Sequence, residues 1–127
     1  MNKYEEWFIL AKSKLRLAYD AVNDEEVHHN DVMYCIQQAV EVTLKTLIVF
    51  YTNELPRKTH DISNLCSSVE EYIGIPQDIL TGILPMTDYV SMRYPHEFEI
   101  GTTEECENAY EIGIKLFEWM KNIITVT

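Results

Sequence analysis

The sequence predicts an all-α protein, an antiparallel up-and-down bundle of four long helices plus one shorter helix. Apolar residues recur at spacings of three and four along most of the chain, which is the period of a helix buried on one side. Gly and Pro number only four each, too few for the many tight turns of an all-β protein. With 127 residues, 46% of them hydrophobic, we expect one helical domain over residues 1–127.

Two long helices are expected in the first half of the chain. The first covers about 18 residues, and its apolar face consists of Trp7, Ala11, Leu15, Ala18 and Val22. A polar loop follows, and the second helix is expected to begin near Asp31, a residue type favoured as an N-cap, and to end near residue 53. This second helix is so widely apolar that it should lie in the middle of the bundle.

Three further helices are expected in the second half. The third begins near Asp61 and is stopped by Gly74, and the fourth begins at Pro76 and continues to about residue 92 with a kink at Pro85. Residues 93–101 are expected to form a loop. The last helix follows Thr102, which has capping-box spacing to Glu105. Its apolar stripe consists of Cys106, Ala109, Gly113, Leu116, Met120 and Ile123.

Charge and cysteine content restrict the class of function. The net charge of −11, from 21 acidic and 10 basic residues, argues against broad binding to nucleic-acid phosphates, which needs clustered Lys and Arg. The three cysteines lie on predicted apolar stripes without zinc-ligand spacing, so we expect reduced thiols and no bound metal or cofactor. Neither a signal peptide nor an uncharged apolar stretch of about 18 residues is recognisable, so we expect a cytoplasmic protein with no membrane association.

Polar residues on and after the second helix offer two interpretations. Gln37, Glu41 and Lys45 lie four residues apart, and the simpler expectation is an exposed stripe with a Glu41–Lys45 pair worth about 0.3 kcal/mol. The alternative is a polar seam that meets a ligand or a second subunit. His60, directly before the third helix, either braces the preceding loop or serves as a functional imidazole.

Two other clusters carry possible chemistry. Acidic and His residues between 24 and 31 are expected to form a solvated loop, with a metal site as the alternative. Residues 93–96, Arg-Tyr-Pro-His, place a guanidinium at the end of a helix before a loop stiffened by proline. Arg93 there either binds a phosphate or bonds the last carbonyls of its own helix.

Three short motifs in series resemble those of the HEPN domain, a family named for nucleotide binding in higher eukaryotes and prokaryotes. They are Gln37-Gln38-Ala39 with Glu41 and Leu44-Lys45, then Thr59-His60-Asp61, then Arg93-Tyr94-Pro95. The resemblance implies a helical bundle, often a dimer. It also implies either a partner of a minimal nucleotidyltransferase in toxin–antitoxin or related defence systems, or a metal-independent ribonuclease. Such ribonucleases use an Arg and a His separated by four to six residues.

The expected function follows from where the chain departs from that ribonuclease motif. Only two residues separate Arg93 from His96, and residues 98–100 contain no His. We therefore expect a non-catalytic module that binds a nucleotide, a nucleotidyltransferase partner, or both, and that forms a homodimer. The alternative is a ribonuclease that acts on RNA through Arg93 and His96. The expected nucleotide-binding residues are Arg93, Tyr94 and His96. The resemblance implies Gln38, Glu41, Lys45 and His60 as secondary candidates.

Overall fold

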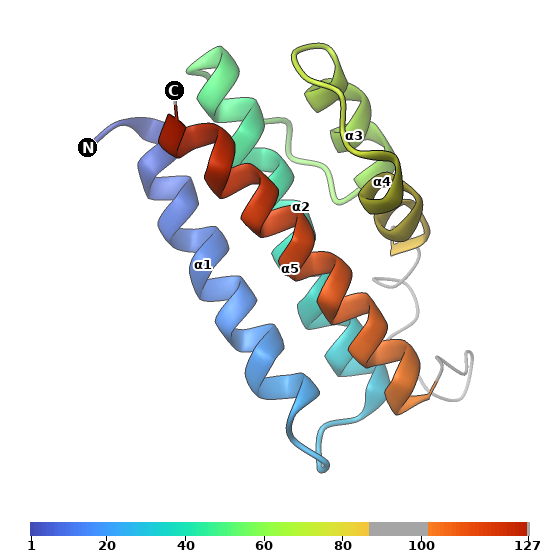
Figure 1. Ribbon diagram of the computed structural model, residues 1–127. Coiled ribbons are helices and arrows are strands. Elements are labelled where there is room, and N and C mark those ends of the chain that lie inside the picture. The colour runs from blue at the N-terminus through green and yellow to red at the C-terminus, as the bar shows by residue number, and fades with distance from the viewer. Residues whose placement is uncertain (87–101, 127) are drawn as a thin grey trace.

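The structure is a computed structural model in which residues 1–86 and 102–126 are described (Figure 1). Over these residues it is all-α, as predicted, with no strand. The helices are α1 (Lys3–Val22), α2 (His29–Thr52), α3 (Ile62–Glu70), α4 (Gln77–Ile83) and α5 (Thr103–Val126). Helices α3 and α4 contain nine and seven residues and are shorter than expected. The predicted continuation of the fourth helix to residue 92 lies outside the described residues.

The three longest helices lie side by side, and α3 and α4 pack on one flank of them (Figure 1). Helix α1 runs antiparallel to α2, but α2 and α5 run parallel, because both begin at the same end of the bundle. At that end His29 Nε2 lies 3.2 Å from Thr103 Oγ1, and the Cys106 thiol donates to the His29 carbonyl at 4.0 Å. The up-and-down order therefore holds for the first two helices in the chain, whereas α2 and α5 meet as parallel neighbours.

Helix α2 is the central helix, as its widely apolar sequence predicted. It packs against α1, α3 and α5, and 15 of its 24 residues are buried. By length and composition α2 is also apolar enough to cross a membrane, but 78% of its most apolar window is buried inside the bundle. That burial is typical of the core helix of a water-soluble bundle, so the apolar composition is accounted for by packing within the chain.

The start of α2 differs from the prediction. The N-cap is His28 and not Asp31, since His28 Nδ1 accepts a hydrogen bond from the Asn30 backbone N–H at 3.0 Å. Asp31 lies within the first turn instead. The other end matches the prediction, because Asn53 ends the helix in the left-handed conformation with φ 55°. Asn tolerates this conformation better than most residues and so can reverse the chain there.

Local hydrogen bonds and turns set the ends of the two shorter helices, α3 and α4. The third helix begins near Asp61 as expected, and the Asp61 side chain caps α3 by accepting from the backbone N–H groups of Ser63 and Asn64 at 2.9 and 3.3 Å. The expected end at Gly74 is wrong, because the helix ends at Glu70 and the chain then turns about the Val69 carbonyl. Pro85 does not kink a longer α-helix but lies in a 3₁₀ turn over residues 84–86.

Candidate functional site

A cluster of polar side chains lies between α2 and the connection over residues 53–61. We call it the Glu41 cluster, and it consists of Gln37, Glu41, Lys45 and His60. The Glu41 carboxylate is its centre: Oε2 accepts from Lys45 Nζ at 3.0 Å, and Oε1 lies 2.9 Å from His60 Nδ1. Gln37 Nε2 donates to the same Oε1 at 3.2 Å. Both oxygens of one carboxylate are therefore engaged by groups from two segments of the chain.

The expectation that Gln37, Glu41 and Lys45 form an exposed stripe is wrong. The side chain of Glu41 is only 4% exposed and that of Lys45 10%, and Gln37 is fully buried. The connection that carries His60 covers this face of α2, and Gln37 Nε2 also donates to the His60 carbonyl at 3.5 Å. The Glu41–Lys45 contact is thus a buried ion pair, for which desolvation and hydrogen bonding matter far more than in a surface pair.

His60 is the member of the cluster that reaches solvent. Its side chain is 68% exposed, although its Nδ1 is held by a buried carboxylate. A carboxylate can only accept a hydrogen bond, so Nδ1 must carry the hydrogen and donate it. The hydrogen bond to Glu41 thereby fixes the orientation of the His60 ring, while Nε2 remains on the exposed part of the ring. Such a nitrogen can accept a proton, or, in the protonated imidazole, donate to an anion.

Gln38, the remaining member of the predicted set on α2, lies beside this cluster. Its side chain is half-buried, and its Nε2 donates to Gln37 Oε1 at 3.1 Å. A chain of hydrogen bonds therefore runs from Gln38 through Gln37 to Glu41 and His60. The structure thus brings together Gln38, Glu41, Lys45 and His60. Arg93, Tyr94 and His96 lie outside the described residues, so the role of that loop stays a prediction.

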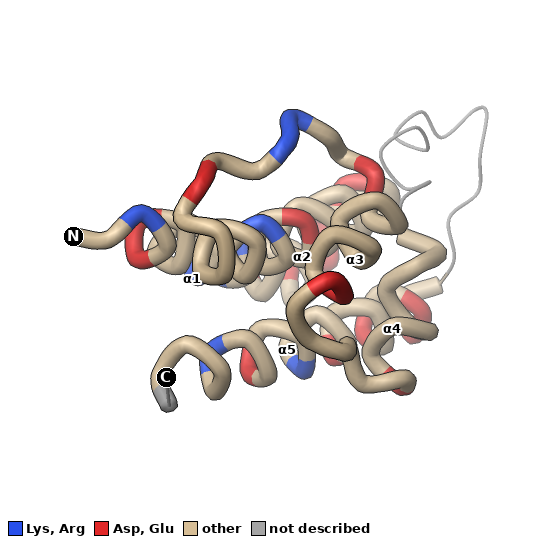
Figure 2. The backbone as a smooth tube through the Cα atoms, turned by 90° about the horizontal axis from the view of Figure 1, so that it is seen from above, with Lys and Arg blue, Asp and Glu red and all other residues tan. Residues whose placement is uncertain are grey.

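Two basic residues beside His60 were missed by the sequence analysis. Arg57 and Lys58 are exposed on the same connection, which forms the separate arch with the blue segment in Figure 2. Neither has an ion-pair partner within residues 1–86 and 102–126. Their signal in the sequence was a pair of adjacent cations, two residues before a His, in a chain with only ten Lys and Arg. The connection therefore presents an exposed pair of cations on an acidic protein, between Glu54 at its start and Asp61 at its end.

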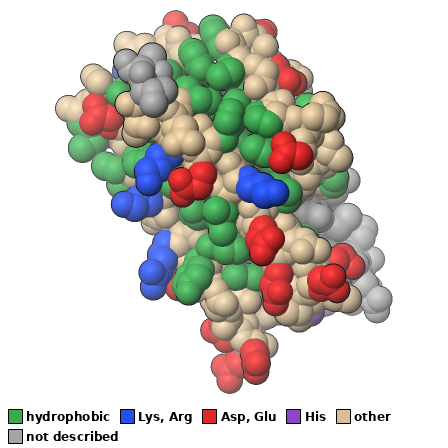
Figure 3. All heavy atoms as spheres, in the orientation of Figure 1, with side chains coloured by type: hydrophobic (Ala, Val, Ile, Leu, Met, Phe, Trp, Pro, Cys, Tyr) green, Lys and Arg blue, Asp and Glu red, His purple; other side chains and the backbone are tan. Residues whose placement is uncertain are grey.

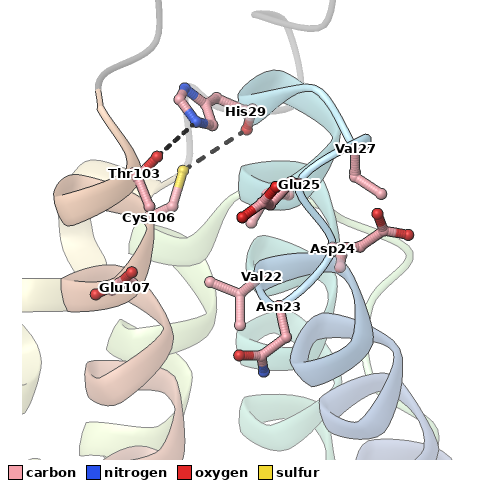
Figure 4. Close-up of a pocket in the computed structure, with 11 residues that line it drawn as sticks. Val22, Asn23, Asp24, Glu25, Val27, His29, Thr103, Cys106 and Glu107 are labelled. Carbon is pink, nitrogen blue, oxygen red and sulfur yellow. Dashed lines mark hydrogen bonds between the residues drawn. The ribbon is translucent and has the colours of Figure 1, made fainter.

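A hollow of about 390 Å³ lies at the other end of the bundle, beside the start of α2 and of α5 (Figure 4). Its lining includes His29 and the carboxylates of Asp24, Glu25 and Glu107, which come from different segments and do not converge in Figure 4. In the described part of the chain, no three His, Cys, Asp or Glu side chains are grouped so as to hold a metal ion. The acidic lining disfavours a phosphate at this end.

Comparisons with known proteins agree with the architecture. Two solved structures share the fold over nearly their whole length. The crystal structure of TT1696 from Thermus thermophilus is 23% identical, with a TM-score of 0.80, and the match covers 96% of this chain and 98% of that one. The structure of ST0689, an archaeal HEPN homologue, is 24% identical with a TM-score of 0.72, and 98% and 99% of the two chains are covered.

Sequence comparison identifies the family. No curated protein matches the chain significantly. The model of the HEPN domain matches residues 4–123, which include the Glu41 cluster. The resemblance inferred from the three short motifs is confirmed, and the chain belongs to the HEPN domain family.

Proposed function

We propose that this chain is a non-catalytic binding module that takes the phosphate group of a nucleotide at His60. The observation that carries the proposal is the exposed His60 imidazole held by the buried Glu41 carboxylate, whose second oxygen is held by Lys45. A protonated imidazole held in this way donates through Nδ1 to Glu41 and through Nε2 to a phosphate oxygen. Because Glu41 orients the ring in advance, little side-chain entropy is lost on binding. Arg57 and Lys58 lie three and two residues before His60 and are exposed, so they are the cations nearest to it along the chain.

The test is a titration with ATP, GTP and their monophosphates, followed by amide NMR shifts. We expect micromolar to millimolar binding with shifts in residues 57–61. His60→Ala should weaken it about ten- to hundredfold, since a hydrogen bond to a charged group is worth about 1.5–3 kcal/mol. His28→Ala is the matched control and should bind like the parent. Equal affinity of His60→Ala and the parent would show that the site is elsewhere, and loss on Arg93→Ala alone would transfer it to the 93–96 loop.

A second candidate function is metal-independent cleavage of RNA by Arg93 and His96. The observation in its favour is that His60 is a further imidazole oriented by a carboxylate, an arrangement that suits proton transfer. We expect no cleavage of single-stranded RNA with or without EDTA, because of the Arg93–His96 spacing and the net charge of −11. Cleavage in EDTA that is lost in Arg93→Ala and His96→Ala would replace the binding proposal by the enzymatic one.

The partner that suits a binding module of this family is a minimal nucleotidyltransferase, in a toxin–antitoxin or related defence system of the cytoplasm. Three unpaired cysteines, two of them buried, support a reducing compartment. The expected result is that a nucleotidyltransferase encoded beside this chain co-purifies with it when the two are co-expressed. Co-purification of an unrelated nucleotidyltransferase to the same extent would argue against a specific partnership.

We further propose that the chain forms an isologous homodimer. The apolar face of α2 is buried within the bundle, whereas α1 exposes the large apolar side chains of Ile9, Leu10 and Leu17. Figure 3 shows apolar side chains along the face where α1 and α5 lie side by side. Light scattering at tens of micromolar should give twice the 14.9 kDa of one chain. Leu17→Glu should give the monomer and Lys12→Glu should not, and a monomeric parent would overturn the proposal.

A further inference from the structure

A hollow lies beneath the 53–61 connection, next to the Glu41 cluster. Its volume is about 210 Å³, and it is enclosed by α2, by α3 and by residues of the connection itself. The apolar part of its lining comes from Ile48, Leu55, Pro56 and Leu65. Leu55 is a large, strongly exposed side chain that borders this hollow. An apolar lining of this kind suits one face of a flat ring.

The polar part of the lining has groups that recognise the edge of a ring. Asn64 is exposed, and its side-chain amide has no hydrogen-bond partner among the described residues. Ser68 donates its hydroxyl hydrogen to the Asn64 carbonyl at 3.2 Å, which leaves its oxygen as an acceptor. Glu71 adds a carboxylate that can only accept. The edge of a ligand that meets Ser68 and Glu71 must therefore carry N–H groups, while Asn64 can both donate and accept.

The volume of the hollow and the charge at its border decide which part of a ligand fits inside it. Pockets that enclose a drug-sized molecule measure about 300–1,000 Å³, so 210 Å³ suits a single ring system and not a whole nucleotide. Arg57 also lines the hollow, and His60 follows it by three residues on the connection. A ring inside the hollow would thus have Arg57 at its border, and a phosphate attached to that ring would meet the Arg57 guanidinium there.

We propose that the hollow beneath the 53–61 connection is the base subsite of the nucleotide site, and that it takes an amino-bearing base such as adenine. This inference rests on the proposed function, because it supplies the base half of the same site. An amide such as Asn64 pairs with the N6 and N7 positions of adenine through two hydrogen bonds. Glu71 accepts from an amino hydrogen, and Arg57 contacts the phosphate from the border of the hollow.

The test uses three probes, which are AMP, adenosine and ribose 5-phosphate, each followed by amide NMR shifts. We expect adenosine to shift residues 55–57, 64 and 68, ribose 5-phosphate to shift residues 57–60, and AMP to shift both sets. Ser68→Trp places an indole in the hollow and should abolish adenosine binding and weaken AMP at least tenfold, while ribose 5-phosphate binds as before. Ser67→Trp is the matched control, because Ser67 is exposed on the same helix and does not line the hollow.

The outcomes separate this inference from the proposed function. AMP binding that is unchanged in Ser68→Trp would overturn the base subsite and leave phosphate binding at His60 in place. Adenosine binding in the hollow, with no gain from the phosphate of AMP, would support the subsite and overturn the phosphate proposal. If none of the three probes binds the folded chain, both proposals are overturned. Asn64→Ala, an exposed change that leaves the hollow open, should weaken AMP about tenfold, and full affinity would exclude Asn64 as the residue that reads the base edge.

Discussion

His28 and His60 both stand just before a helix, and both use Nδ1, yet the structure gives them different capacities. His28 Nδ1 accepts from a backbone N–H two residues away, so the ring is part of the cap of α2. His60 Nδ1 donates to a carboxylate 19 residues away in the sequence. The opposite hydrogen-bond roles follow from the partners, since an N–H can only donate and a carboxylate can only accept. A local contact makes one His structural, whereas a tertiary contact orients the other toward solvent.

The charged residues near His28 and His60 also differ. The connection before α2 contains Asp24, Glu25 and Glu26 and no Lys or Arg. The connection before α3 contains Arg57 and Lys58, which balance its two carboxylates. An anionic ligand therefore meets less repulsion beside His60 than beside His28. The comparison shows that the residue type and its place before a helix do not identify a functional His. The partner of its ring and the sign of the neighbouring charges do.

The largest effect should come from removing Glu41. Glu41→Ala leaves the Lys45 ammonium buried without its carboxylate, so we expect a loss of about 3–5 kcal/mol in the free energy of unfolding, measured by urea unfolding. Glu25→Ala, in the exposed acidic connection, should change it by less than about 0.5 kcal/mol. The double variant Glu41→Leu with Lys45→Met should recover most of the loss. Equal stability of Glu41→Ala and Glu25→Ala would contradict the predicted difference between the buried Glu41 cluster and the exposed acidic connection.

A smaller effect on the free energy of unfolding is expected at alkaline pH, from Cys66 on α3 and Cys106 on α5. Burial, and then the carboxylates of Glu70 and Asp61, raise the pKa of the Cys66 thiol on α3 to about 12 from 9.0. The folded state therefore keeps a proton that the unfolded state loses between these values, so stability falls as pH rises from about 9 to 12. Cys66→Ala should reduce that slope by up to about 1.4 kcal/mol per pH unit.

Cys106 on α5 provides the comparison for Cys66. Its pKa is also raised, mainly by burial and then by Glu105 and Glu107, but less far. Cys106→Ala should therefore change the alkaline slope less than Cys66→Ala does, in urea unfolding measured between pH 8 and 10.5. Identical slopes for the two variants and the parent would show that neither thiol titrates differently on unfolding.

The smallest effect concerns the cap of α2. His28→Ala should cost about 1 kcal/mol of unfolding free energy, because the Asn30 N–H loses its acceptor, and His28→Asn should restore most of it. The readout is thermal or urea unfolding followed by circular dichroism. Asp31→Ala serves as the comparison, and a larger loss there than at His28 would return the capping role to the residue that the sequence suggested.

Local sequence patterns predicted most of the fold. The end of α2 near residue 53, the start of α3 near Asp61 and the family itself were readable, since each depends on residues close together in the chain. The burial of the Glu41 cluster was not, because it depends on the connection folding back over α2 to place His60 on Glu41. A stripe of Gln, Glu and Lys at helical spacing is the same pattern whether water or another segment covers it.

The start of α2 and the end of α3 show a second limit. Asp31 has the better residue type for a cap, but His28 is the residue whose ring reaches the free N–H. Gly74 is a good helix terminator, yet α3 ends four residues earlier, where the Tyr72 and Ile73 N–H groups share the Val69 carbonyl. The free-energy differences between neighbouring residues as the start or end of a helix are small, and composition and spacing do not resolve them.

The parallel course of α2 and α5 has a consequence for the charge of the protein. Each helix carries roughly half a positive charge at its N-terminus from aligned peptide dipoles, and these two ends meet at the same end of the bundle. Asp31, Glu104 and Glu105 occupy the first turns there, and the acidic 23–28 connection adjoins them. These carboxylates, six of the 21 acidic residues of the chain, thus offset the positive ends of two dipoles that would otherwise repel each other.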